Sequence, residues 1–143
     1  MIHIKQLLLL ILLCFTLGVH AQSQETFFTL QPTLTPNGET IIFSYQGDLW
    51  KVPSSGGNAF RLTAMDGNET KPSVSPDGKW LAFSSNQYGN NDVYVMPISG
   101  GSITQLTFHD SGDNVSSWSW DSSKIYFVSG RYNALTTYSV ALN

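Results

Sequence analysis

Short apolar stretches separated by turn residues recur along this chain, and the same arrangement of them occurs three times. The clearest copy runs from Lys71 to Thr107 and reads KPSVSPDGKWLAFSSNQYGNNDVYVMPISGGSITQLT. A close match precedes it, from Gln31 to Thr63, and a more divergent match begins at Ser116. Matching positions lie about 40 to 45 residues apart, and a repeat of several strands at this spacing is typical of a propeller blade.

Within each copy the apolar runs predict short strands. Asp-Gly or Asn-Gly pairs between them supply the left-handed backbone that a hairpin turn needs. No segment after the N-terminal region keeps a helical period, and four antiparallel strands joined by such turns make one blade. The predicted strands are Phe27–Thr35, Thr40–Tyr45, Leu49–Val52 and Ala59–Thr63 in the first copy, Pro72–Ser75, Trp80–Ser85, Asp92–Ile98 and Ile103–Thr107 in the second, and Ser116–Ser119, Lys124–Ser129 and Leu135–Leu142 in the third.

The predicted fold class is therefore all-β, a partial β-propeller over residues 22–143 with blades at 27–63, 70–107 and 115–143. Two of these blades are complete and four-stranded. The third is incomplete, because the Gly-Gly turn before its outer strand would fall beyond Asn143. A closed propeller needs at least about four blades, so we expect the chain to be the N-terminal fragment of a longer protein or a truncated gene product.

Three apolar columns recur on corresponding strands of the copies. Stacked blades bury both faces of their inner strands, so we expect the members of a column to meet across neighbouring blades. A ligand-stacking surface is the alternative for an aromatic column, but the recurrence of one residue type in every copy favours core packing. The columns are Ile41, Leu81 and Ile125; Phe43, Phe83 and Phe127; and Trp50, Tyr94 and Tyr138.

The N-terminal residues follow a different pattern, which predicts a secretory signal peptide at residues 1–21. A charged start with Lys5 leads into an apolar run from Leu7 to Leu17, and Val19–Ala21 suits a signal peptidase site. A membrane anchor is the alternative, but the apolar run is short for a bilayer span. We therefore expect a bacterial protein that is exported to the periplasm or secreted, with no membrane segment after cleavage.

Charge and cysteine content narrow the function classes further. The formal net charge of the chain is −3. Loss of Lys5 with the signal peptide makes the exported part more acidic, which argues against nucleic-acid binding. Cys14 is the single cysteine and would leave with the signal peptide, so the exported part must rely on its packed core rather than on disulfides.

His109 is the one histidine after the predicted signal peptide and the first candidate for acid–base chemistry. It lies in the loop between the second and third copies, close in sequence to Asp110 and Asp113. A hydrolase triad also needs a nucleophile, and no G-x-S-x-G elbow is present in the sequence. A solvated loop histidine is therefore the preferred interpretation.

Asp66, Asp110 and Asp113 offer the oxygen ligands that calcium prefers, but the fixed spacing of a calcium loop is missing. No glycine-rich phosphate loop and no Cys/His cluster is present in the sequence. We therefore assign no catalytic, cofactor-binding or metal-binding residue and expect no cofactor. The aspartates that recur between copies favour a role in capping turns; they are Asp77 with Asp121, and Asp48 with Asp92.

Three strings of the second copy, SPDGKWLAFSS, NDVYVMPISGG and QLT, resemble the WD-like propeller repeats of TolB and of tricorn-type proteases. The first copy narrows this resemblance, because YQGDLWKVPSSGGNAFRLT is similar to the opening blade of the tricorn protease propeller. The string FHDSGDNVSSWSWDSSKIYFVSGR resembles the third blade there. The resemblance extends from Thr29 to the C-terminus and is specific for the fold, while TolB-like and dipeptidyl-peptidase-like propellers use similar blades.

The tricorn resemblance implies a non-catalytic propeller segment of an exported serine protease. Such propellers resemble gates or filters that admit peptides to a protease core, whose catalytic residues lie outside this chain. The implied partners are downstream propeller and protease domains of the full-length protein and peptide or protein ligands. The alternative is a TolB-like periplasmic propeller that interacts with other proteins.

Overall fold

Every described strand of the protein belongs to one of three antiparallel sheets. A computed structural model describes residues 30–132 and 134–142. The predicted signal peptide, the start of the first predicted blade, Asn133 and Asn143 lie outside these described residues. The sheets contain four, four and three strands, so the all-β prediction with two complete blades and one incomplete blade is confirmed. In the part of the chain that is described, no helix is long and apolar enough to cross a membrane.

Each sheet is built in chain order, so that every strand pairs with the strand that follows it. The first blade consists of β1 (Leu30–Leu34), β2 (Thr40–Tyr45), β3 (Asp48–Pro53) and β4 (Phe60–Arg61). The second blade consists of β5 (Glu69–Val74), β6 (Trp80–Ser85), β7 (Asp92–Pro97) and β8 (Thr104–Gln105). The third blade consists of β9 (Asp113–Trp118), β10 (Lys124–Tyr132) and β11 (Ala134–Ala141).

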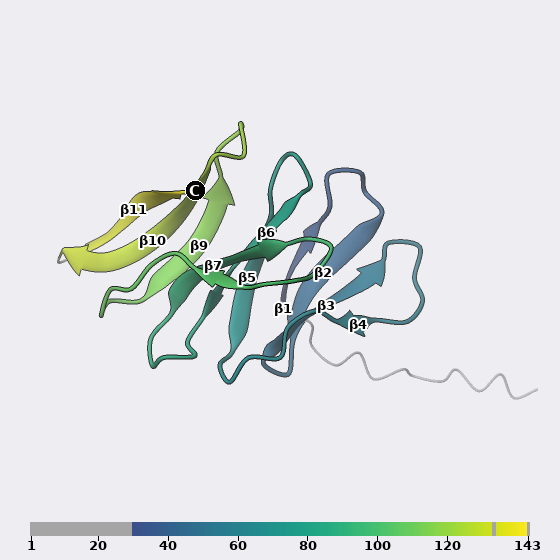
Figure 1. Cartoon of the computed structure of the whole chain (residues 1–143), viewed down its shortest axis with the longest axis horizontal. Coiled ribbons are helices and arrows are strands. Elements are labelled where there is room, and N and C mark those ends of the chain that lie inside the picture. The colour runs from purple at the N-terminus through teal and green to yellow at the C-terminus, as the bar shows by residue number, and fades with distance from the viewer. Residues whose placement is uncertain (1–29, 133, 143) are drawn as a thin grey trace, which may run out of the picture.

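The three blades follow one another across the molecule, from the blue first blade to the yellow third blade (Figure 1). The first strands of the blades lie in sequence, because β5 contacts both β1 and β9. β5 also contacts β2 and β3, and β9 contacts β6 and β7, so each first strand packs against the preceding blade. Lys71 on β5 donates its backbone N–H to Oε1 of Gln31 on β1 at 2.7 Å, which joins the first two blades directly.

The second strand of each complete blade has the predicted bounds, Thr40–Tyr45 and Trp80–Ser85. The outer strands are shorter than predicted, because β4 and β8 comprise two residues each. In the third blade, β9 begins before the predicted Ser116 and β10 continues beyond the predicted Ser129. Turn signals therefore located the central hairpins well and the outer strands poorly.

The turn between the first two strands uses the same hydrogen bonds in the second and third blades. Ser75 Oγ donates to Asp77 Oδ1 at 2.6 Å, and Gly78 N–H donates to the Ser75 carbonyl at 2.9 Å. Gly78 has a φ of 71°, which glycine adopts without steric cost. The third blade has Ser122 at this position, with a φ of 61°, and its Oγ accepts a hydrogen bond from the Asp77 N–H at 3.1 Å. The less favourable turn is thus tied to the neighbouring blade.

The second blade shows how the apolar columns are arranged. Phe83 on β6 pairs with Tyr94 on β7, and their ring centroids are 5.8 Å apart. Because successive residues of a strand point to opposite faces, these rings share one face of the blade, which we call the column face. The column faces of the three blades consist of Ile41, Phe43, Trp50 and Val52; of Leu81, Phe83, Tyr94 and Met96; and of Ile125, Phe127, Tyr138 and Val140.

The members of a column do not meet across blades as predicted, because the column faces of the second and third blades pack on the other face of the preceding blade. We call this other face the reverse face. Ile42 and Leu49 form one buried cluster with the column face of the second blade. Val93 and Val95 form another with the column face of the third blade. The reverse faces consist of Ile42, Ser44, Leu49 and Lys51; of Ala82, Ser84, Val93 and Val95; and of Tyr126, Val128, Thr137 and Ser139.

Leu81 and Phe83 are fully buried, and Tyr94 keeps only 3% of its surface exposed. The column of the second blade therefore serves core packing, as the sequence predicts, and is closed to a ligand. Phe127 is likewise buried, and it lies on the face of the third blade that packs against the second.

We predict that Phe83→Ala lowers the free energy of unfolding by about 3 to 5 kcal/mol, because it leaves a cavity between the first and second blades. Tyr88→Ala is the matched control, since Tyr88 is 69% exposed and its removal leaves no cavity. Denaturant unfolding of both variants measures the difference. Equal losses of stability in the two variants would contradict the packing described here.

Candidate functional site

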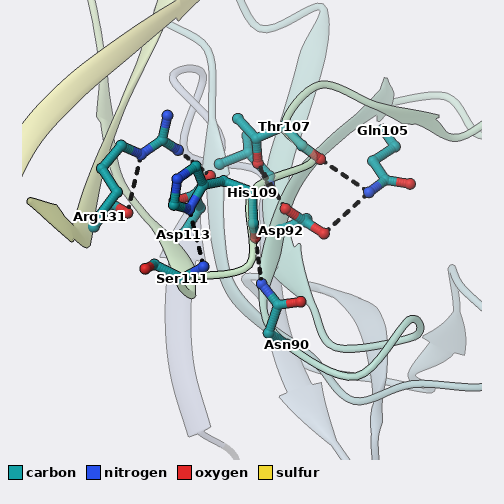
Figure 2. Close-up of polar contacts among 10 residues, drawn as sticks. Asn90, Asp92, Gln105, Thr107, His109, Ser111, Asp113 and Arg131 are labelled. Atoms are coloured by element: carbon teal, nitrogen blue, oxygen red, sulfur yellow. Dashed lines mark hydrogen bonds and ion pairs between the residues drawn. The ribbon is translucent and has the colours of Figure 1, made fainter.

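A group of polar residues lies where β7 and β9 begin and where the chain leaves β8 (Figure 2). It includes His109 and Asp113, two of the residues that the sequence offers as candidates for chemistry. The remaining members come from the loops and strand ends around them. Its hydrogen bonds decide whether the group is built for catalysis or for holding the blades together.

Asp92 opens β7, and its carboxylate holds the segment that leaves β8. Gln105 Nε2 donates to Asp92 Oδ2 at 3.0 Å and to the Thr107 carbonyl at 2.9 Å. Thr107 Oγ1 donates to Asp92 Oδ1 at 3.2 Å and accepts a hydrogen bond from the Val93 N–H at 2.9 Å. Both carboxylate oxygens of Asp92 therefore bind the segment that closes the outer edge of the second blade.

The first blade carries a similar arrangement, with Arg61 in place of Gln105 and with a threonine hydroxyl that donates to Glu69 instead of to Asp48. Arg61 Nη2 lies 2.9 Å from Asp48 Oδ2, and Arg61 Nε donates to the Thr63 carbonyl at 2.7 Å. Thr63 Oγ1 accepts a hydrogen bond from the Leu49 N–H at 2.8 Å. The sequence carries a signal for this arrangement, since D-L-W precedes R-L-T in the first copy and D-V-Y precedes Q-L-T in the second.

The turn-capping prediction is thus wrong for Asp48 and Asp92, which fasten the outer segment of their blades. It is confirmed for the other recurring pair of aspartates. Asp121 Oδ1 accepts hydrogen bonds from Ser119 Oγ at 2.6 Å and from the Ser123 N–H at 3.1 Å. The bond from Ser119, together with those from Ser123, lowers the pKa of Asp121 to about 2. The corresponding turn of the second blade is the one that Ser75 and Asp77 form.

The second blade begins with a buried carboxylate, that of Glu69. Thr63 Oγ1 donates to Glu69 Oε2 at 2.9 Å, and Ser85 Oγ donates to Oε1 at 3.1 Å. Burial raises the pKa of the Glu69 carboxyl group, and these two hydrogen bonds oppose the rise. The carboxylate thereby joins the end of the first blade to the second strand of the next.

Asp113 holds the corresponding position in the third blade, but it has a different partner. Arg131 Nη2 lies 2.6 Å from Asp113 Oδ2. The Arg131 guanidinium also lies over two aromatic rings, 5.2 Å from the Phe127 centroid and 4.9 Å from the Tyr138 centroid. Asp113 Oδ1 has no hydrogen-bond partner within the described residues. An aspartate is one methylene shorter than a glutamate, and Thr107 donates to Asp92 instead.

Two buried carboxylates, those of Asp92 and Asp113, lie near each other at the boundary between the second and third blades. We call this boundary the second seam, and the boundary between the first and second blades the first seam. Burial raises the pKa of Asp92, and the negative charge of Asp113 adds to the rise, while the hydrogen bonds from Thr107 and Gln105 oppose it. Arg131 supplies the one cation that contacts the pair among the described residues, through Asp113. The electrostatics of the group are those of a structural seam, in which Asp113 is paired with Arg131 and Asp92 accepts hydrogen bonds from the neutral side chains of Gln105 and Thr107.

His109 lies beside this group without forming a catalytic arrangement. Its Nδ1 accepts a hydrogen bond from the Ser111 N–H at 3.0 Å, and its carbonyl accepts one from Asn90 Nδ2 at 2.7 Å (Figure 2). Across the described ranges, no hydrogen bond joins the His109 ring to a serine hydroxyl or to an aspartate. The structure thus does not bring the sequence-derived triad candidates into contact.

The three aspartates considered as calcium ligands, Asp66, Asp110 and Asp113, differ in their exposure to solvent. Asp66 and Asp110 are exposed, whereas Asp113 is fully buried and paired with Arg131. In the described part of the chain, there is no group of three His, Cys, Asp or Glu side chains that could hold a metal ion.

Open hollows lie on the surface around the seams. One of about 370 Å³ is lined by residues that include Asp92, Gln105 and His109. A groove of about 400 Å³ lies at the seam between the first two blades, where Lys51 and Asp77 are among its lining residues. These hollows offer hydrogen bonds and charge to a ligand, and neither contains a nucleophile paired with a base.

Comparison with known proteins identifies a family that this chain matches. The family model described as "Tricorn protease N-terminal beta propeller domain" matches residues 26–142. The protein named Tricorn protease homolog 1, from Streptomyces coelicolor, is 36% identical over 58 residues. This similarity covers 41% of the chain and 5% of that relative, so the chain spans a small part of the relative's length.

Solved structures share the arrangement of the blades. TolB from Acinetobacter baumannii superposes with a TM-score of 0.66 at 23% identity, over 81% of this chain and 30% of that one. The tricorn protease superposes with a TM-score of 0.61 at 15% identity, over 81% of this chain and 13% of that one. A puromycin-hydrolysing peptidase of Mycobacterium tuberculosis gives 0.61 at 16% identity, over 80% and 22%. At these identities the likeness shows a common propeller fold.

We predict that Arg131→Met lowers the free energy of unfolding by about 3 to 5 kcal/mol, because it leaves the buried Asp113 carboxylate without its cation. The double variant Arg131→Met/Asp113→Asn should recover part of this loss, since the uncompensated charge is then gone. Denaturant unfolding of the three proteins at neutral pH gives both values. A double variant less stable than Arg131→Met would contradict the pairing.

We also predict a pKa of about 2 for Asp121, measurable by carboxyl-carbon NMR during an acid titration. Because this pKa lies below the ordinary value of about 4, the turn is fully stabilised at higher pH. That stability is lost as the pH falls toward 2. Ser119→Ala should raise the pKa of Asp121, since it removes the foremost hydrogen bond. An unchanged pKa in Ser119→Ala would show that Ser119 does not hold the carboxylate.

Proposed function

Because the chain belongs to the family of tricorn protease N-terminal β-propeller domains, we propose that it is a non-catalytic propeller segment of an exported tricorn-like serine protease. In this role it gates or binds peptides for a protease core that lies outside these residues. The observation that carries the proposal is the family match over residues 26–142, which spans all three stacked blades.

The polar groups of the structure support a non-catalytic role. Asp92 and Asp113 are held by fixed structural partners, and His109 accepts a hydrogen bond from the backbone instead of activating a nucleophile. The Streptomyces relative is far longer than the region of similarity, which supports the expectation of downstream propeller and protease domains as partners in one polypeptide. The charged and apolar pattern of residues 1–21 supports export.

A TolB-like propeller that interacts with other proteins is the second candidate. It is favoured by the superposition on Acinetobacter TolB, whose TM-score of 0.66 is higher than the 0.61 of the tricorn protease. Export suits this candidate equally well. The two proposals differ in what the same polypeptide contains besides blades.

An antibody raised against residues 30–142 tests the choice in the source cells. The tricorn-like proposal predicts an immunoreactive polypeptide much larger than this chain, which hydrolyses peptides after immunocapture. The chain of 143 residues, produced alone, should hydrolyse none of them. A polypeptide that contains a single propeller and lacks peptidase activity would support the TolB-like candidate, and peptidase activity of the 143-residue chain alone would overturn both.

Export is tested on the natural polypeptide by N-terminal sequencing. We expect the mature protein outside the cytoplasm to begin at Gln22. Leu10→Arg should keep it inside the cell, because a charge in the apolar run blocks recognition as a signal peptide, whereas Gln24→Arg, beyond the cleavage site, should not. A cytoplasmic protein that retains Met1 would overturn the proposed localisation.

A further inference from the structure

An open hollow at the second seam combines aromatic rings with carboxylates and has no cation of its own. We propose that it binds the arginine side chain of a peptide, with the guanidinium against the rings of Tyr88 and Phe108 and its charge paired with Asp110. The role of this site rests on the proposed function, since it names a side chain that peptides bound by such a segment carry. The residues concerned belong to the second blade and the segment that leaves it, and this blade has a neighbour on either side.

The hollow lies where β7 begins and where the chain leaves β8, and its volume is about 370 Å³. Pockets for small ligands have volumes of roughly 300–1,000 Å³, so one long side chain fits. Two lining residues are large and exposed aromatics, Tyr88 at 69% and Phe108 at 75%. Two others are aspartates, the buried Asp92 and the exposed Asp110.

The charges around the hollow are unbalanced. Arg131 pairs with Asp113 at 2.6 Å, whereas Asp92 accepts hydrogen bonds from neutral side chains. Among the described residues, no lysine or arginine pairs with Asp92 or Asp110, and none lines the hollow. The surroundings therefore favour a positively charged ligand.

The molecule already holds one guanidinium between a carboxylate and aromatic rings. That of Arg131 lies 5.2 Å from the Phe127 ring centroid and 4.9 Å from that of Tyr138. Its Nη2 contacts the Asp113 carboxylate. A guanidinium is planar and weakly hydrated, so it stacks on aromatic rings more readily than an ammonium group does. The hollow offers the same two kinds of partner without the cation, and arginine is therefore the ligand that suits it.

Hydrogen bonds fix the two segments that carry the rings. Asn90 Nδ2 donates to the His109 carbonyl at 2.7 Å (Figure 2). This bond ties the loop that contains Tyr88 to the segment that contains Phe108. Neither ring contacts another aromatic ring among the described residues, so both remain available to a ligand. A site whose parts are fixed in advance loses less entropy when it binds.

The hollow is a feature of the second blade and does not recur with the repeat. Residues 86–91 separate β6 from β7, whereas only two residues separate β2 from β3. Tyr88 comes from this longer loop, and Ala64 stands where the second copy has Phe108. The first blade forms without either aromatic residue, so neither is needed to build a blade. Their exposure in the second blade is thus explained by a ligand rather than by packing.

Titration of the whole 143-residue chain with two peptides tests the proposal. Both are pentapeptides with acetylated and amidated ends and alanines around a central residue. The central residue is arginine in one and citrulline, its neutral isostere, in the other. Amide NMR should show that the arginine peptide binds and shifts the signals of residues 86–91 and 107–111. Citrulline should weaken binding by about tenfold, because the ion pair and the attraction of a cation to the rings are lost.

Variants of the hollow separate its parts. Tyr88→Ala, Phe108→Ala and Asp110→Asn should each weaken binding of the arginine peptide by about two- to fivefold. Trp120→Ala and Asp66→Asn are the matched controls and should bind as the parent does. Trp120 is an exposed aromatic residue in another turn, and Asp66 is exposed and stands at the position of Asp110 in the preceding loop. Circular dichroism checks that each variant keeps its β structure.

Other results would overturn the proposal. Equal affinity for the two peptides, or signal shifts outside the hollow, excludes recognition of a guanidinium there. Undiminished binding by both Tyr88→Ala and Phe108→Ala refutes the role of the rings, and an equal loss in Trp120→Ala shows non-specific contact. The titration needs no protease core. A natural polypeptide without peptidase activity would therefore refute the proposed function and leave this binding intact, while absence of binding would leave the proposed function intact.

Discussion

The second and third blades keep their positions by burying a face of large apolar side chains on the reverse face of the blade before them. This contact depends on the alternation of side chains along a strand. Phe83 and Tyr94 point toward the first blade, while Val93 and Val95, on neighbouring positions, point toward the third. A shift of pairing by one residue would exchange the two faces, so the register of the central hairpin determines both seams at once.

The central hairpins were predictable because their signals are local. Asn-Gly and Asp-Gly turns bound the apolar runs, and β2 and β6 begin and end where those signals place them. The outer strands were predicted too long for a reason that involves distant residues. The N–H groups of Leu49 and Val93 donate to the threonine hydroxyls of Thr63 and Thr107, which interrupts the regular ladder after two residues.

The partner of each column was not predictable in the same way. Recurrence of Phe43, Phe83 and Phe127 indicates that the position is buried, and all three are buried core residues. It does not indicate what covers the position, because every blade carries the same residue. The observed cover, such as Ile42 and Leu49 for the second blade, comes from adjacent positions that vary between copies and therefore give a weaker signal.

The polar group at the second seam was also difficult to predict from the sequence, because its partners are distant along the chain. Asp48 and Asp92 recur beside turns, which made capping a reasonable interpretation, but their partners Arg61 and Gln105 lie on the far side of a hairpin. Asp113 and Arg131 are brought together only by the pairing of β9 with β10.

Burial of a carboxylate at the start of a blade costs free energy unless the group is partnered, and the molecule partners both oxygens of Glu69 but only Oδ2 of Asp113. Glu69 reaches hydroxyls on both sides of its seam, whereas Asp113 relies on the guanidinium of Arg131. In each case the carboxylate and its partners come from different segments of the chain, so the bonds form only when these segments are in place. We interpret these carboxylates as groups that specify how one blade follows another. The same fixed partners give these carboxylates a structural role at the seams, where Glu69 ties the end of the first blade to the start of the second and Asp113 ties the first strand of the third blade to its second strand.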